Sequence, residues 1–300
     1  MERRTFLQTV ALSALAATSL TQVSSGAERL LPRFQPRMRQ AGRQRVAKKK
    51  IPIAVQVYSV RKAAEKDLAA VLEGIAKLGY AGVEFAGYYG KDAKDIRKML
   101  DDNGLKCCGT HTGIGLLRGD NFEKTAELHK TLGAKFMIVP GGINKELHQV
   151  DSNKAIAEEF NVLAEKAKKL DLCVGYHAHG GDAKLIDGIP AWERFFDATS
   201  ADVIMQMDLG NYQMGDDGNG GHGDPYKMIE KFKGRSKTVH LKEAGANAPI
   251  IGDGEVDWKR AFNLCETIGG TEWYVVEDEK AADSLERIEK CIAALRKMGK

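Results

Sequence analysis

Two imidazoles and two carboxylates stand at the ends of four short apolar segments in the C-terminal half of the chain. They are His177, Asp208, His240 and Glu277. A mixed set of nitrogen and oxygen donors suits Mn, Co, Zn or Fe better than Ca, which prefers oxygen ligands alone, and Mg is a further alternative. A single histidine in a strand is more often a hydrogen-bonded core residue. Four donors at equivalent positions instead predict one divalent metal ion.

A lysine and a third histidine follow the candidate ligands at a spacing of two residues. Lys242 follows His240, and His179 follows His177. Alternate side chains of a strand face the same side, so both should reach the same cavity. A lysine near a metal has a lowered pKa and can act as a base or bind an oxyanion, which makes Lys242 a candidate catalytic residue. Its alternative is an ion pair with Glu243 or Glu277, whereas His179 is expected to contact the substrate.

Two more polar residues, Glu84 and His111, end apolar segments earlier in the chain. On the opposite wall of the same cavity they would bind substrate. The alternative is a buried, hydrogen-bonded pair with a structural role.

Short β-rich runs alternate with helical stretches from residue 51 onward. The expected strands are Ile53–Ser59, Ala81–Ala86, Lys106–His111, Lys135–Val139, Leu172–His177, Val203–Asp208, Ser236–Lys242 and Trp273–Asp278. The expected helices include Lys62–Lys77, Lys91–Asp102, Ala155–Lys169 and Ala282–Lys297. Eight such units predict an α/β protein with a (β/α)8 TIM barrel. An open doubly wound sheet is the alternative, but it needs no eighth unit and usually carries an early glycine-rich turn, whereas the stretch 216–223 comes late.

Residue parity within the expected strands supports the barrel. In Val239-His240-Leu241-Lys242 the apolar residues take one parity and the polar residues the other, and Glu84 likewise opposes its apolar neighbours. The apolar side would pack on the outer helices and the polar side would point into the barrel. The polar residues also gather at the C-terminal strand ends, where the active sites of such barrels lie.

The N-terminal part of the chain is expected to lie outside the barrel, which should span residues 51–300. Arg3 and Arg4 precede an apolar run, and Ser25-Gly26-Ala27 resembles a cleavage site, so residues 1–27 are expected to be a twin-arginine signal peptide. The run is too short to span a bilayer, although a retained anchor and a cytoplasmic amphipathic helix are alternatives. Residues 28–50 are expected to be a basic flexible linker. These features predict an exported or periplasmic protein.

The charge of the chain is unevenly distributed. Residues 28–50 hold nine Lys or Arg and one Glu, and residues 1–27 hold two Arg and one Glu. Because the whole chain carries +4, residues 51–300 carry a net −5. An acidic barrel argues against nucleic acid as substrate. The five cysteines show no C-x-x-C spacing, and most are expected to be buried apolar residues.

Ordered motifs across residues 51–298 resemble the xylose isomerase-like barrel superfamily, which includes sugar phosphate isomerases and epimerases, inosose dehydratase and endonuclease IV. The motifs are Gln56-Val57-Tyr58-Ser59-Val60-Arg61, Gly82-Val83-Glu84, Gly109-Thr110-His111, Tyr176-His177-Ala178-His179, Met207-Asp208-Leu209-Gly210-Asn211, Val239-His240-Leu241-Lys242 and Val276-Glu277. The resemblance implies metal ligands at the ends of strands five to eight. It also places Glu277 as both ligand and base.

One departure from the family pattern bears on the reaction. Ketose epimerases of this group carry a glutamate base on strand five and another on strand eight, whereas this chain has His177, or His179 in a shifted alignment, on strand five. His177 and Glu277 are therefore the candidate catalytic pair, together with Lys242. The resemblance implies a metal-dependent isomerase or epimerase that acts on a small carbohydrate through an enediolate. A lyase or dehydratase of a keto-sugar or cyclitol and a non-catalytic sugar-binding barrel are the alternatives, and the sequence gives no oligomeric state.

Overall fold

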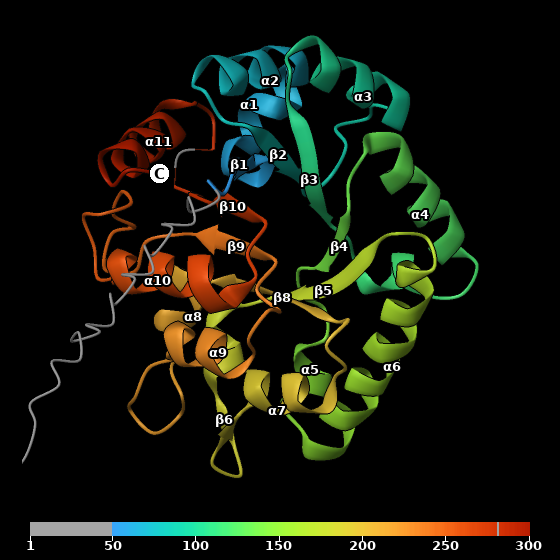
Figure 1. The fold of residues 1–300 in the computed structure, drawn as a ribbon, viewed down its shortest axis with the longest axis vertical. Helices are drawn as coiled ribbons and strands as arrows, with labels where there is room; N and C mark the ends of the chain where they lie inside the picture. Colours follow the sequence, from blue (N-terminus) through green and yellow to red (C-terminus); the bar gives the residue numbers. More distant parts are fainter. Residues whose placement is uncertain (1–49, 281) are drawn as a thin grey trace, which may run out of the picture. The chain divides into compact units, whose positions relative to one another are not determined.

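Eight parallel strands close into a barrel in the computed structural model, which describes residues 50–300 except residue 281 (Figure 1). The strands are β1 (Ile53–Gln56), β2 (Gly82–Phe85), β3 (Lys106–His111), β4 (Phe136–Val139), β5 (Cys173–His177), β8 (Ile204–Asp208), β9 (Thr238–Leu241) and β10 (Trp273–Val276). Their order is β1-β10-β9-β8-β5-β4-β3-β2, and β1 pairs with β10. The TIM barrel is therefore confirmed and the open sheet is excluded. The predicted signal peptide and residues 28–49 of the predicted linker lie outside the described residues.

Helices surround the ring of strands (Figure 1). They are α1 (Arg61–Lys66), α2 (Leu68–Lys77), α3 (Ala93–Asp102), α4 (Asn121–Leu132), α5 (Asn144–Leu147), α6 (Val150–Lys168), α7 (Ala191–Ala198), α8 (Leu209–Gln213), α9 (Pro225–Lys231), α10 (Trp258–Leu264) and α11 (Glu286–Lys297). A small hairpin, β6 (Leu185–Ile186) and β7 (Ile189–Pro190), interrupts the connection from β5 to β8. The helix expected over 62–77 is divided because Asp67 accepts a hydrogen bond from the Ala70 backbone N–H at 3.0 Å and so caps α2.

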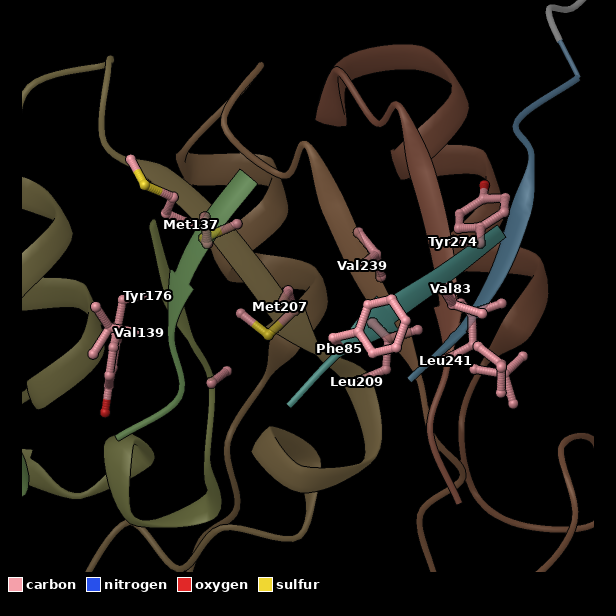
Figure 2. Packing of buried hydrophobic residues seen from close by; sticks show 14 of the residues in the cluster. Val83, Phe85, Met137, Val139, Tyr176, Met207, Leu209, Val239, Leu241 and Tyr274 are labelled. Carbon is pink, nitrogen blue, oxygen red and sulfur yellow. The ribbon is translucent and has the colours of Figure 1, made fainter. Parts of the chain in front are cut away.

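The predicted strand parity is present in the core. Val83 and Phe85 of β2, and Met207 of β8, belong to the large apolar cluster between strands and helices (Figure 2). Glu84 and Asp208 alternate with them, are fully buried and point into the barrel. Two small apolar clusters fill the barrel interior, and their buried members are Ala54, Cys108, Val275, Phe136, Ile138 and Ile204. The polar residues therefore sit above an apolar floor.

All five cysteines are free, so the adjacent pair Cys107 and Cys108 forms no disulfide. Four are buried and Cys173 is partly buried, as most were expected to be. Across residues 50–300, leaving out 281, no helix has the length and apolar character needed to cross a membrane.

Candidate metal centre

Four donor side chains converge at the C-terminal mouth of the barrel. His177, Asp208 and His240 end or nearly end β5, β8 and β9, and Glu277 follows β10. Each offers one ligand atom, and these atoms lie within 4.8 Å of one another. His240 Nδ1 lies 2.5 Å from Glu277 Oε2 and 4.0 Å from Asp208 Oδ2, and His177 Nε2 lies 3.9 Å from the same Asp208 oxygen. The structure thus brings the four sequence-predicted ligands together.

The far ring nitrogen of each histidine is anchored from below. His177 Nδ1 lies 3.0 Å from Gln206 Oε1, and His240 Nε2 lies 2.7 Å from Glu84 Oε2. Both acceptors require an N–H on those nitrogens, which leaves His177 Nε2 and His240 Nδ1 as the nitrogens that face the cluster. Metal-binding histidines in proteins are commonly oriented in this way by a carboxylate or carbonyl.

Asn211, three residues after Asp208, orients the Asp208 carboxylate. The Asn211 backbone N–H donates to Asp208 Oδ1 at 2.8 Å, and Asn211 Nδ2 donates to Asp208 Oδ2 at 2.9 Å. The first bond also caps α8, so the helix start fixes the carboxylate. Each candidate ligand other than Glu277 therefore has a partner that holds it toward the cluster.

Glu84 lies at the centre of this supporting layer and has no exposed surface. Its oxygens accept from Gln56 Nε2 and Gln206 Nε2, each at 2.8 Å, besides the bond from His240. His111 Nε2 lies 2.9 Å from Gln206 Oε1 and 3.2 Å from Glu84 Oε2. Two of the three predicted substrate-binding residues belong to this layer: the structure places Glu84 beneath the site as a hydrogen-bond centre, whereas His111 also lines the open chamber above.

Burial and paired charges shift the pKa values of this cluster. Burial raises the pKa of Glu84, but His111 and His240 more than offset it, and the carboxyl pKa lies well below its ordinary value. Burial lowers the pKa of His240, yet Glu84 and Glu277 raise it to about 10. Burial also raises the pKa of Asp208 to about 7. In the absence of a metal, a proton on His240 balances these carboxylates.

The donor set fits a divalent cation. Two carboxylates and two neutral imidazoles match the charge of a divalent ion, and a cation would take over the compensating role of the His240 proton. The supporting bonds to Gln206 and Glu84 need not change, because they use the ring nitrogens on the far side. His177, Asp208, His240 and Glu277 are the residues that would hold such an ion.

An open polar chamber of about 570 Å³ lies above the cluster. Its polar lining is formed by Tyr58, His111, His177, His179, Asn211, Glu277 and Glu279. His179 is fixed at the rim because its backbone N–H donates to Asp182 Oδ2 at 2.8 Å. Burial lowers the pKa of the His179 ring, which keeps the imidazole neutral. The chamber therefore places the His179 imidazole above the candidate metal-ligand cluster.

Lys242 lies beside Glu277 but pairs with a residue that the sequence did not suggest. Its Nζ donates to Glu279 Oε1 at 2.5 Å. The predicted alternative partner Glu243 instead accepts from the backbone and from Trp258 Nε1 at 2.7 Å. Burial lowers the pKa of Lys242, but Asp208, Glu277 and Glu279 more than offset it, so the pKa is raised. Lys242 therefore presents a charged ammonium near the cluster.

The family model described as xylose isomerase-like TIM barrel matches residues 72–298. The chain belongs to this family. It is 26% identical to an inosose dehydratase of Erwinia tasmaniensis over 259 residues, covering 72% of this chain and 84% of that protein. A crystal structure of a sugar phosphate isomerase/epimerase from Parabacteroides distasonis superposes with a TM-score of 0.69 and 27% identity, covering 84% of this chain and 95% of that one.

A second solved structure, an IOLI protein with a bound zinc atom, has a TM-score of 0.63 and 14% identity. It covers 82% of this chain and 97% of that one, and at this identity it shows the shared fold alone.

Several site residues of this xylose isomerase-like barrel were not assigned a role from the sequence. Gln206 and Gln56 support the ligands, Asn211 orients Asp208, and Glu279 pairs with Lys242. Strand parity and position could have indicated three of them. Gln206 shares the inward parity of Asp208, and Gln56 ends β1 at the level of Glu84. Glu279 follows Glu277 by two residues. Asn211 lies in a short helix, where strand parity gives no information.

Proposed function

We propose that this protein is a metal-dependent lyase or dehydratase that acts on a keto-cyclitol or keto-sugar. The observation that carries the proposal is the convergence of His177, Asp208, His240 and Glu277 below a polar chamber. The similarity to inosose dehydratases over most of the chain supports elimination over epimerisation. A histidine on β5, where ketose epimerases carry a glutamate, supports the same choice.

The chemistry needs a polarised carbonyl, a base and a donor for the departing oxygen. His177, Asp208, His240 and Glu277 would hold a divalent ion, which would supply Lewis-acid polarisation of a carbonyl and so make the adjacent C–H more acidic. His179 is placed to accept the carbon proton, because its ring lines the chamber and stands outside the ligand set. Lys242 Nζ, on the other side of Glu277, supplies N–H donors to the oxygen that departs. Glu277 and His177, the other two predicted catalytic residues, then act chiefly as ligands.

The polar chamber suits a small polyhydroxylated substrate. Imidazole, amide and carboxylate groups line it, and Tyr58, which is 39% exposed, offers an aromatic face at the rim. Arg61 stacks on the Tyr58 ring at 4.1 Å from the ring centre and holds it in place. A carbohydrate or cyclitol finds in this chamber both hydrogen-bond partners and an apolar face.

Incubation of the metal-loaded protein with inosose and a panel of ketoses in deuterated water tests the proposal by NMR. An unsaturated product with loss of water or of a substituent is the expected result. Failure of every panel member to lose a group or to exchange a C–H proton would contradict it. His179→Asn should lower turnover roughly a hundredfold, the usual scale for a lost general base, while metal content stays unchanged.

Isomerisation or epimerisation is the second candidate function. The observation in its favour is the similarity to the sugar phosphate isomerase/epimerase of Parabacteroides distasonis. The same NMR experiment separates the two, because an isomerase or epimerase gives a saturated sugar that carries deuterium next to the carbonyl. A non-catalytic sugar-binding barrel would show binding with neither product nor exchange.

A further inference from the structure

A second chamber, of about 450 Å³, adjoins the polar one. It lies between the segment that follows β9 and the segment that follows β10. Its apolar lining comes from Met214, Ala248, Pro249, Ile251 and Cys291. Ile251 and Cys291 are buried in the protein core, while Met214 is 47% exposed at the lip. The proposed chemistry of the metal cluster uses Lys242 and Glu277 at the edge of this chamber but none of its apolar residues.

The wall of the apolar chamber is held in a strained backbone conformation. Asn247 and Ala248 have φ angles of 65° and 49°, which are unfavourable for residues with a side chain. Their carbonyls accept hydrogen bonds from Lys280 Nζ and from Arg287 Nη2, the latter at 2.6 Å. Arg287 Nε also donates to Asp278 Oδ1 at 2.6 Å, so the two segments are tied together. These bonds fix the position of the segment that forms this wall of the chamber.

The two chambers share lining residues at the proposed reaction centre. Glu277 and Glu279 line both chambers, and Lys242 lies on the apolar side of this boundary. Hydroxyls placed against the apolar wall of this chamber would lose water without finding partners on that wall. An apolar substituent would gain from burial against Ile251 and Met214.

We propose that the apolar chamber binds the group that leaves, and that the substrate is a keto-sugar with an aryloxy or alkoxy group on the carbon β to the carbonyl. This inference rests on the proposed eliminating activity. The base removes a proton from the carbon beside the carbonyl, a C=C bond forms, and the C–O bond to the apolar group breaks with its electron pair on oxygen. That oxygen takes a proton from the Lys242 ammonium, which regains one from solvent, while His179 releases the carbon proton to solvent. The products are an unsaturated keto-sugar and an alcohol or phenol, and no oxidant is needed.

Binding of two glycosides that cannot be eliminated tests the chamber separately from catalysis. Methyl β-D-glucopyranoside and 4-nitrophenyl β-D-glucopyranoside lack the ketone and differ only in the apolar group. The full-length, metal-loaded protein should bind the aryl glycoside at least about tenfold more tightly in calorimetry, since burial of an aromatic ring is worth this much or more. Met214→Glu and Ile251→Ala should reduce this preference to about twofold or less.

Val162→Glu is the matched control, because Val162 is an exposed apolar residue, 54% accessible, on α6 and outside both chambers. It should keep the aryl preference. Equal affinity of the wild-type protein for the two glycosides would overturn the proposal. So would a preference that survives in both chamber variants when their melting temperatures show that they are folded.

Turnover then tests the leaving group. The wild-type protein should release 4-nitrophenol from the 3-keto form of the 4-nitrophenyl glycoside. In Met214→Glu the KM for this substrate should rise at least about fivefold, while kcat is largely kept. Aryl preference without phenol release, from a protein that does convert inosose, would overturn the assignment of the chamber to the leaving group. If no substrate of either kind is converted, the proposed function itself fails, and the glycoside affinities still report on the chamber.

Discussion

The two ring nitrogens of each candidate ligand histidine have different tasks in this barrel. His177 and His240 each use one nitrogen to bind a supporting side chain, Gln206 or Glu84, and present the other to the cluster. The supporting bonds fix the tautomer and the ring orientation before any metal arrives. Preorganisation of this kind lowers the free-energy cost of metal binding.

Asp208→Ala and His240→Ala should each empty the metal site and leave the barrel folded. The wild-type protein is expected to hold about one divalent ion per chain, because four donors converge on one point. Elemental analysis measures the ion and circular dichroism the fold. His222→Ala, which removes an exposed histidine outside the cluster, should keep full occupancy. Full occupancy in either cluster variant would remove that residue from the ligand set.

Lys242→Met should lower turnover roughly a hundredfold without changing metal content, because it removes the N–H donor beside the departing oxygen and leaves the ligands intact. Glu279→Gln breaks the same ion pair but keeps the ammonium, so its loss of turnover should be much smaller. Near-normal turnover of Lys242→Met with a lowered melting temperature would reduce Lys242 to a structural ion pair.

At the scale of single elements, the turns that follow β5 and β8 set the geometry of the site. The turn after β8 requires Gly210, because an added Cβ would lie 2.5 Å from the Glu243 carbonyl oxygen. This close approach brings the start of α8, and with it Asn211, onto Asp208. The turn after β5 is held by Asp182, which is buried and bonds the His179 backbone and Tyr176 Oη.

Asp182 gives the folded protein a specific pH dependence. Burial raises its pKa to about 7 from an ordinary 3.8, although the bonds from His179 and Tyr176 act in the opposite direction. Between these values only the folded state keeps the proton, so this group lowers the free energy of unfolding as pH rises from about 4 to 7 and has no further effect above. The Asp182→Asn variant has no ionisable group at this position. Its free energy of unfolding, relative to that of the wild type, should therefore rise by a few kcal/mol between about pH 4 and 7.

Chemical unfolding of the metal-free proteins at pH 4 to 8 measures this effect. Asp253→Asn, at an exposed position in the segment after β9, is the control and should follow the wild type. A constant difference between Asp182→Asn and the wild type across the interval would show that Asp182 is already ionised in the folded protein.

At the scale of the whole molecule, the chain joins an acidic barrel to a basic N-terminal region with the features of an export signal. We propose that the protein is exported through the twin-arginine route, which carries folded proteins and would allow the metal to be loaded beforehand. The mature protein should then begin near Glu28 and be found in the periplasmic fraction. Mass spectrometry of the native protein checks this, and an intact Arg3-Arg4 in that fraction would contradict processing. Replacing both arginines by lysine should retain the precursor in the cytoplasm.

The fold and the candidate ligand set of this protein can be predicted from short-range features of its sequence. Eight β-rich segments that alternate with helical stretches predict the strands, and period-two alternation in several of them predicts one apolar and one polar side. The strand ends of a parallel barrel share one face. His177, Asp208, His240 and Glu277 could be recognised because each stands at a strand end, where side-chain direction follows from parity alone. The split of the helix at Asp67 was missed, because a capping side chain competes locally with helix continuation.

The partners of these side chains were decided by tertiary structure. Barrel register sets Gln206 opposite His177, and Asp208 opposite His240, and no single segment carries that information. The same holds for Lys242, whose partner Glu279 lies in the segment that follows the neighbouring strand β10. The apolar chamber is equally non-local, since Met214, Ile251 and Cys291 come from three separate elements. Sequence patterns determine which way a side chain points, whereas the stagger and closure of the barrel determine what it meets.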